Sequence, residues 1–125
     1  MYVLDSSAII ELIEKTPRGE RVENFMRDTA LVTTSICMHE VMAGATSKEE
    51  FFIFEGLFAT MQVLDHTKEA AKEGAKIEQD LTRTGNLISA RDILIAGICK
   101  ARGGEIVTFD KGFTKIKGLK SHVLE

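Results

Sequence analysis

Short apolar runs alternate with longer amphipathic segments along this chain of 125 residues. The runs predict strands at residues 2–5, 31–34, 61–64, 105–109 and 121–124. Between them, apolar residues recur every three or four positions, and this spacing predicts helices at 7–14, 19–28, 36–43, 48–59, 67–84 and 90–101. Because strands and helices alternate, we expect an α/β fold with a mainly parallel sheet, in a single domain covering residues 1–125.

Small polar residues and glycines mark where several of these helices begin and end. Ser35 is placed to cap the third helix, and Gly44 suits its C-terminal end. Gly85 interrupts the longest helix, and Ser89 is placed to cap the last one. The first and fourth strands are apolar almost throughout, which predicts that helices cover both faces of the sheet.

Four carboxylates lie beside these apolar segments, where an ionised acid loses hydration and is costly without a partner. Asp5 and Asp110 each follow an apolar strand, and the functional crevice of a parallel sheet lies outside the carboxyl ends of its strands. Glu40 lies on the apolar face of its helix. No lysine or arginine lies within one turn of it, so we expect a cation there rather than a salt bridge. Asp92 opens the last helix and shares its apolar stripe.

Three of the acids also have a structural interpretation. Asp5 can cap the helix that follows it, Asp92 matches a capping box with Ser89, and Asp110 can start a turn. The four acids together are stronger evidence for a functional site than any one of them, because the fold can bring all four to one crevice. Ligation by oxygen alone favours Mg²⁺ or Mn²⁺ over zinc. We therefore predict that the same four residues are metal ligands and catalytic groups: Asp5, Glu40, Asp92 and Asp110.

Composition narrows the class of protein. Hydrophobic content of 44% and charged content of 28% are typical of a globular domain, and a net charge of −3 argues against a generic polyanion binder. A lysine strip near the C-terminus is either a solvated face or a phosphate-attracting surface: Lys111, Lys115, Lys117 and Lys120.

The sequence also favours an intracellular setting. No apolar run is long enough to span a bilayer, and we expect no signal peptide and no membrane contact. Cys37 and Cys99 lie in apolar helical stretches, which favours buried thiols over a disulfide. We expect a cytoplasmic protein.

Taken together, these segments resemble the PIN-domain ribonucleases of the VapC toxin type. The resemblance rests on motifs that occur in order along nearly the whole chain: VLDSSA at 3–8, TS at 34–35 with EVMAG at 40–44, Arg83, Gly85 and Ile88 followed by Asp92 with IA at 95–96, and VTFDKGF at 107–113. Each motif alone is weak, and the four together are fairly specific.

The resemblance implies a three-layer α/β/α sandwich with an acidic pocket for Mg²⁺ or Mn²⁺, held by Asp5, Glu40, Asp92 and Asp110. Ser6 and Thr108 would support the pocket by binding a water or orienting a carboxylate. Many relatives carry a further acid where this chain has Gly112, and an arginine where it has Phe109. The resemblance therefore implies one firm metal site and leaves a second site open. It also implies that the phosphate contact made by this arginine in relatives is missing here.

The implied activity is cleavage of single-stranded or looped RNA by a metal-activated water, giving 5′-phosphate and 3′-hydroxyl ends. Basic residues near the acids are candidates for phosphate contact: Arg83, Arg91, Lys111 and Lys115. The resemblance further implies a small antitoxin, whose C-terminal segment lies in the acidic groove, and a homodimer. The helices at 7–14 and 48–59 are candidates for these interfaces or for ordinary core. The second of them carries a broad apolar face: Phe51, Phe52, Phe54, Leu57 and Phe58.

Two other classes of α/β protein fit the acids less well. A haloacid-dehalogenase-type phosphatase needs a second aspartate where this chain has Ser7, and a phospho-receiver needs paired acids where Ser6 follows Asp5. A catalytically weak PIN-like RNA-binding or scaffold protein is harder to separate from a nuclease, because such a protein keeps the fold. The presence of all four acids argues against it.

Overall fold

The computed structural model describes residues 1–125 and contains five strands, six α-helices and one 3-10 helix. The strands are β1 Tyr2–Leu4, β2 Val32–Thr34, β3 Gln62–Leu64, β4 Glu105–Thr108 and β5 Ser121–Val123. The helices are α1 Ser6–Glu14, α2 Pro17–Phe25, α3 Ser35–Ala43, α4 Lys48–Phe58, α5 Lys68–Thr84 and α6 Ala90–Ala101, and the 3-10 helix η1 covers Lys111–Lys115. Every predicted element is present, with boundaries shifted by three residues or fewer.

All strand pairs are parallel, as the alternating pattern predicts. Strands β1, β4 and β5 form one sheet in the order β1-β4-β5, and β2 pairs with β3. The two sheets adjoin along β1 and β2, where the Thr33 hydroxyl donates a hydrogen bond of 2.8 Å to the Leu4 carbonyl oxygen. Because β1 and β4 are neighbouring parallel strands, their carboxyl ends lie side by side.

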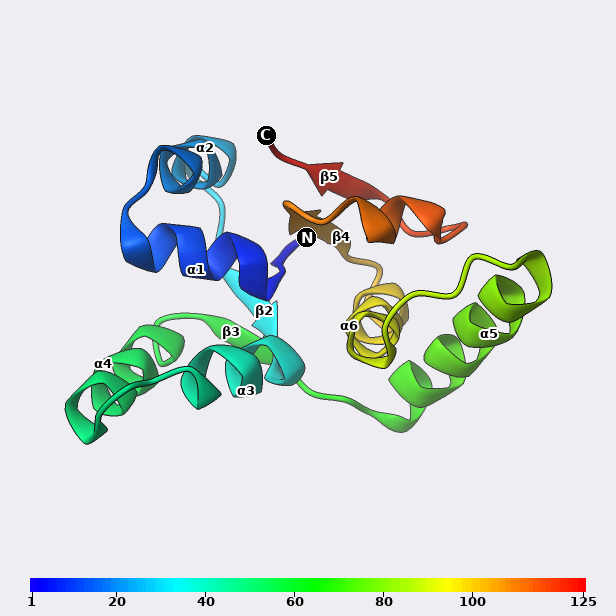
Figure 1. Ribbon diagram of the computed structural model, residues 1–125, viewed down its shortest axis with the longest axis horizontal. Coiled ribbons are helices and arrows are strands. Elements are labelled where there is room, and N and C mark those ends of the chain that lie inside the picture. The colour runs from blue at the N-terminus through cyan, green and yellow to red at the C-terminus, as the bar shows by residue number, and fades with distance from the viewer.

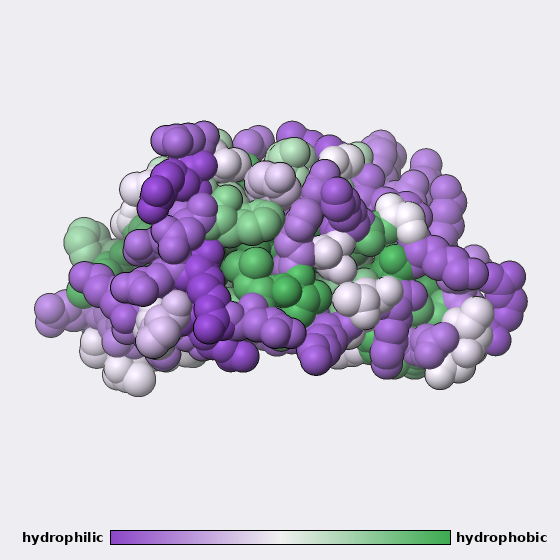
Figure 2. Space-filling model, turned by 90° about the horizontal axis from the view of Figure 1, so that it is seen from above, coloured by the Kyte–Doolittle hydropathy of each residue, from purple (hydrophilic) through white to green (hydrophobic).

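Helices lie on both sides of the strands (Figure 1). Helices α1 and α2 pack together on one side, and α5 and α6 form a hairpin on the other. The buried apolar residues make one continuous cluster of 26 residues that spans strands and helices. Seen from above, apolar residues reach the surface in the middle of the molecule, with polar and charged residues around them (Figure 2). The prediction of an α/β fold with a parallel sheet is confirmed.

Helix ends follow local side-chain chemistry, with one correction to the sequence prediction. Thr34, rather than Ser35, caps α3, because the helix begins directly after β2 and the Thr34 hydroxyl accepts from the Cys37 amide at 3.1 Å. Ser89 caps α6 as predicted. Gly85 ends α5 in the left-handed conformation (φ 72°), which a side chain disfavours.

The apolar face predicted on α4 is only partly buried. Phe58 is in the core, whereas Phe51, Phe52 and Ile53 are exposed, Phe52 at 73%. Interpretation of this helix as ordinary core is therefore wrong for its first half. The periodic pattern identified a face without showing whether other parts of the chain cover it.

The two cysteines are buried and free, as the sequence predicts. None of the helices combines the length and the apolar character needed to cross a membrane.

Candidate active site

The carboxyl ends of β1 and β4 bring Asp5 and Thr108 together. The strands are in register, with Leu4 opposite Val107, and the Asp5 amide donates to the Val107 carbonyl oxygen at 2.9 Å. Both side chains then emerge at the same edge of the sheet. This is the edge at which parallel sheets place their functional residues.

Asp5 is almost fully buried, with 2% of its surface exposed, and a set of donors orients its carboxylate. Oδ1 accepts from the Ser6 amide at 2.8 Å, so Asp5 also caps α1. Oδ2 accepts from the Thr108 hydroxyl at 2.8 Å and from the Ser7 hydroxyl at 3.0 Å. The structural interpretation of Asp5 as a cap is correct, and it leaves the carboxylate fixed at the sheet edge.

Ser7 is a residue that the sequence did not single out for the site. Its hydroxyl contacts Asp5, lies 3.3 Å from the Thr108 hydroxyl oxygen, and accepts from the Phe109 amide at 3.1 Å. It thus ties the end of β1 to the end of β4. The signal available in the sequence was the second hydroxyl after Asp5.

Thr108 connects Asp5 to Asp110. Its hydroxyl oxygen accepts from the Asp110 amide at 2.9 Å while donating to Asp5. The Asp110 carboxylate turns to cap η1, where Oδ1 accepts from the Gly112 amide at 2.8 Å. A Cβ atom at Gly112 would stand 3.2 Å from Asp110 Oδ1. Glycine therefore leaves room for the Asp110 carboxylate at the start of η1.

Asp92 is buried in the first turn of α6, where the Ser89 hydroxyl accepts from its amide at 3.2 Å. Only 5% of the residue is exposed. Burial raises the pKa of the Asp92 carboxyl above its ordinary value, and the negative charge of Asp5 adds to this rise, while Arg91 opposes it. Asp92 is therefore both a first-turn acid, as the capping-box pattern predicts, and an electrostatic neighbour of Asp5.

The structure corrects the inference that Glu40 is buried without a basic partner. Glu40 is partly exposed rather than buried, and it forms a salt bridge with Arg91, although the sequence argued against such a pair. That argument considered only residues within one helical turn, whereas Arg91 lies 51 residues away and reaches Glu40 from α6. Arg91 also donates to Asp92 Oδ1 from Nη2 at 3.1 Å and from Nε at 3.3 Å.

The other basic residues predicted for phosphate contact lie on the surface. Arg83 is exposed in the last turn of α5 and pairs with Asp80. Lys111 and Lys115 are exposed on η1 and form no ion pair. Their side chains are therefore available for contact with a ligand.

The chemistry of the donors fits a hard divalent cation. Asp5 and Asp92 are buried carboxylates that influence each other electrostatically, and Oδ2 of Asp92 accepts no hydrogen bond from the protein. As the side chains are arranged, no three His, Cys, Asp or Glu residues form a group that could hold a metal ion. Two of the four acids instead hold Arg91 between them.

Comparison with known proteins agrees with this geometry. The PIN domain family model matches residues 2–119. A tRNA(fMet)-specific endonuclease VapC of Salmonella typhimurium is 27% identical over 95% of this chain and 94% of its own length. The structure of DNA-bound VapBC from Salmonella typhimurium superposes with a TM-score of 0.83 at 27% identity, covering 97% of this chain and 96% of that one. VapBC2 from Rickettsia felis, bound to a promoter fragment, shares the fold with a TM-score of 0.83, at 21% identity and with coverage of 97% and 96%.

Proposed function

This chain belongs to the PIN domain family, and from that premise we propose that it is a metal-dependent endoribonuclease and the toxin of a VapBC-type toxin–antitoxin pair. Its substrate is single-stranded or looped RNA in the cytoplasm. The endonuclease activity named for the Salmonella relative supports this assignment, as does that of a ribonuclease VapC2 from Haemophilus influenzae, 26% identical over 82% of this chain.

The observation that carries the proposal is a pair of buried carboxylates that interact electrostatically: Asp5 at the carboxyl end of β1 and Asp92 in the first turn of α6. Two ionised acids in this position cost stability without a counter-charge. The hydroxyls of Ser7 and Thr108 fix the direction of Asp5, which is an arrangement suited to positioning rather than to simple packing. Ser6 contributes its amide to the same carboxylate.

Each acid has a proposed role in the reaction. Asp5 and Asp92 bind Mg²⁺ or Mn²⁺, Glu40 completes the set from α3, and Asp110 contributes from the start of η1. This makes one firm site and leaves a second open. When bound, the cation supplies Lewis-acid polarisation of the scissile phosphate and lowers the pKa of water toward neutrality. The hydroxyl of Thr108 holds Asp5 in one orientation through the reaction.

Basic side chains at the rim would bind the RNA backbone. Lys111 and Lys115 project from η1, directly after Asp110, and Arg83 lies at the end of α5. Their attraction for phosphate offsets the repulsion between RNA and the acidic centre.

Cleavage of RNA with Mg²⁺ or Mn²⁺ tests the proposal. We expect EDTA, Asp5→Asn and Asp92→Asn each to abolish cleavage. Asp65→Asn is the matched control, because Asp65 also follows a strand, β3, but is exposed and is expected to keep full activity. Cleavage that survives EDTA and both substitutions would refute the nuclease centre, and RNA binding without cleavage would favour the scaffold alternative.

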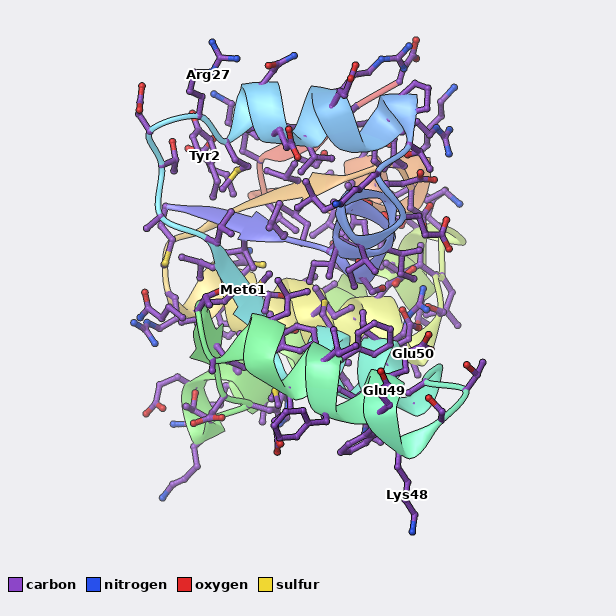
Figure 3. The ribbon with its side chains drawn as sticks, turned by 90° about the vertical axis from the view of Figure 1, so that its left-hand side faces the viewer. Tyr2, Arg27, Lys48, Glu49, Glu50 and Met61 are labelled. Atoms are coloured by element: carbon purple, nitrogen blue, oxygen red, sulfur yellow. The ribbon has the colours of Figure 1, made fainter.

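In this proposal the antitoxin also contacts an apolar groove between α1, α2 and α4, besides the acidic groove expected for its C-terminal segment. The apolar groove has a volume of about 430 Å³ and a mainly apolar lining. Figure 3 looks onto this side, with Met61 between α2 and α4. An amphipathic helix that lays its apolar face into such a groove is a common mode of peptide recognition. Residues of the groove include Ile9, Leu12, Val22, Met26, Leu57 and Met61.

Co-expression with the antitoxin, which this proposal expects to be encoded beside this chain, tests the groove. We expect the two proteins to co-purify, Leu12→Glu to abolish the complex, and Leu87→Glu to preserve it, because Leu87 is exposed outside the groove. Circular dichroism would verify that both variants fold. Co-purification of Leu12→Glu at the level of the original chain would exclude the groove as the docking site.

We further propose that the chain forms a homodimer through α3 and the exposed half of α4. Met38, Met42 and Phe51 line a shallow hollow of about 440 Å³ between these helices. Light scattering should give a dimer for the original chain and for Leu87→Glu, and a monomer for Phe51→Glu. A dimer that persists in Phe51→Glu would show that the contact lies elsewhere.

A further inference from the structure

A single arginine joins two of the four acids of the candidate active site. The Arg91 guanidinium donates to Asp92 Oδ1 from Nη2 at 3.1 Å and from Nε at 3.3 Å, and its Nη1 contacts Glu40. The two carboxylates come from different helices, α6 and α3. Arg91 is thus the link that holds these helices' acids to one another.

No other basic side chain forms an ion pair with Asp5, Glu40, Asp92 or Asp110. The cluster of acids therefore depends on Arg91 for the only positive charge in direct contact with it. Asp92 is the more demanding partner, because its side chain is 7% exposed, whereas that of Glu40 is 32% exposed. A buried carboxylate that lacks a partner is strongly destabilising.

The position of Arg91 also conflicts with metal binding. Asp92 Oδ1 and Glu40 Oε2 both accept from the guanidinium, which therefore lies between two carboxylates that a divalent cation would have to share. As the side chains stand, no three acids are gathered around a common point. A guanidinium and a divalent cation repel each other, so both cannot lie between the same carboxylates.

We propose that Arg91 is an exchangeable counter-ion: it holds Glu40 and Asp92 in the ion-free protein, and it leaves them when Mg²⁺ or Mn²⁺ binds. This inference rests on the proposed metal-dependent function. It makes Arg91 a positioning residue that competes with the cation, which differs from the role of direct phosphate contact expected from the sequence.

The local structure allows the exchange. The Arg91 side chain is 44% exposed and donates only to the two carboxylates, so water can solvate the guanidinium once they are released. Because the pairs are partly exposed, the competition is modest and corresponds to about a three- to tenfold difference in cation affinity. The ion-free acids thereby remain together without closing the site to metal.

Metal affinity and stability, measured without RNA, test the proposal. Electron paramagnetic resonance measures the concentration of free Mn²⁺ during a titration. We expect Arg91→Gln to bind Mn²⁺ about three- to tenfold more tightly than the original chain, and to unfold at a lower urea concentration in EDTA. Arg83→Gln is the control. It makes the same change of charge on a neighbouring helix, where Arg83 pairs with Asp80 alone, and it should leave both quantities nearly unchanged.

Arg91→Lys keeps the charge and removes the forked donor geometry, so we expect an affinity between those of the original chain and Arg91→Gln. Unchanged or weaker Mn²⁺ binding by Arg91→Gln would overturn the inference, because Arg91 would then not compete with the cation. Absence of Mn²⁺ binding in every variant would instead overturn the proposed metal-dependent function, so the two failures are distinguishable.

Discussion

Replacing Thr108 with valine isolates the hydroxyl at the centre of the site, because the two side chains have nearly the same shape. Thr108 is fully buried, and its hydroxyl donates to Asp5 Oδ2 and accepts from the Asp110 amide. A hydrogen bond to a charged group contributes about 1.5–3 kcal/mol, and a buried amide left without an acceptor costs about 1–3 kcal/mol. Since water can partly replace these partners at the sheet edge, we expect a loss of about 3 kcal/mol.

Thr33→Val is the matched control for this substitution. Thr33 is equally buried, but its hydroxyl makes a single hydrogen bond to a neutral acceptor, the Leu4 carbonyl oxygen. The expected cost is about 1 kcal/mol. Urea unfolding followed by circular dichroism would measure both, and the difference of about 2 kcal/mol corresponds to a separation of about 8 °C in melting temperature.

Cleavage should separate the two variants as well. Thr108→Val releases Asp5 from its fixed orientation and should lower kcat at least tenfold, whereas Thr33→Val should retain most of the activity. The reasoning is refuted if Thr108→Val is no less stable than Thr33→Val and cleaves RNA equally well. In that case the contact with Asp5 would be incidental.

Three further predictions concern packing, thiols and pH. Gly97→Ala should destabilise by about 1–3 kcal/mol in urea unfolding, because the new Cβ would stand 2.6 Å from a backbone oxygen of α5. Gly56→Ala, with open space around it, should stabilise by about 0.5–1 kcal/mol; equal effects would contradict the packing. Burial raises the pKa of Cys37 to about 11, so this thiol should resist alkylation at pH 8 until urea unfolds the chain, and rapid labelling of the folded protein would disagree. The hydrogen bond from His122 lowers the pKa of Glu105 in the folded protein. This contact stabilises the fold fully above the carboxyl's unfolded pKa of about 4.3, and the stabilisation is lost as pH falls through the lower folded pKa. Stability measured from pH 5 down to pH 3 should therefore decline less in His122→Phe than in the original chain, and parallel curves would argue against this contact.

Local patterns in the sequence predicted the framework of the site. Asp5 follows an apolar strand, and Ser89 precedes an amphipathic helix, so strand ends and helix starts placed Asp5 and Asp92 correctly. Thr34 and Ser35 are adjacent hydroxyl residues, and either one could cap the helix as far as the sequence shows. Thr34 is the cap because β2 ends there and α3 begins at the next residue. Such one-residue choices depend on neighbouring strands rather than on the helix itself.

Contacts between distant segments were not accessible from the sequence. The Arg91–Glu40 pair depends on how α6 packs beside α3, and no local rule relates residues 51 positions apart. Exposure of Phe52 has a similar origin, because helical periodicity identifies an apolar face without showing what covers it. Both features follow from the arrangement of helices around the sheet.

Mapping of 5′-phosphate RNA ends in cells, after brief induction of this chain, tests the central claim most directly. Sequencing of such ends should reveal new cleavage sites within single-stranded or looped RNA, and induction of Asp5→Asn at the same protein level should produce none of them. The account would be contradicted if the two inductions gave the same ends, because the acidic centre built on Asp5 would then not cleave RNA.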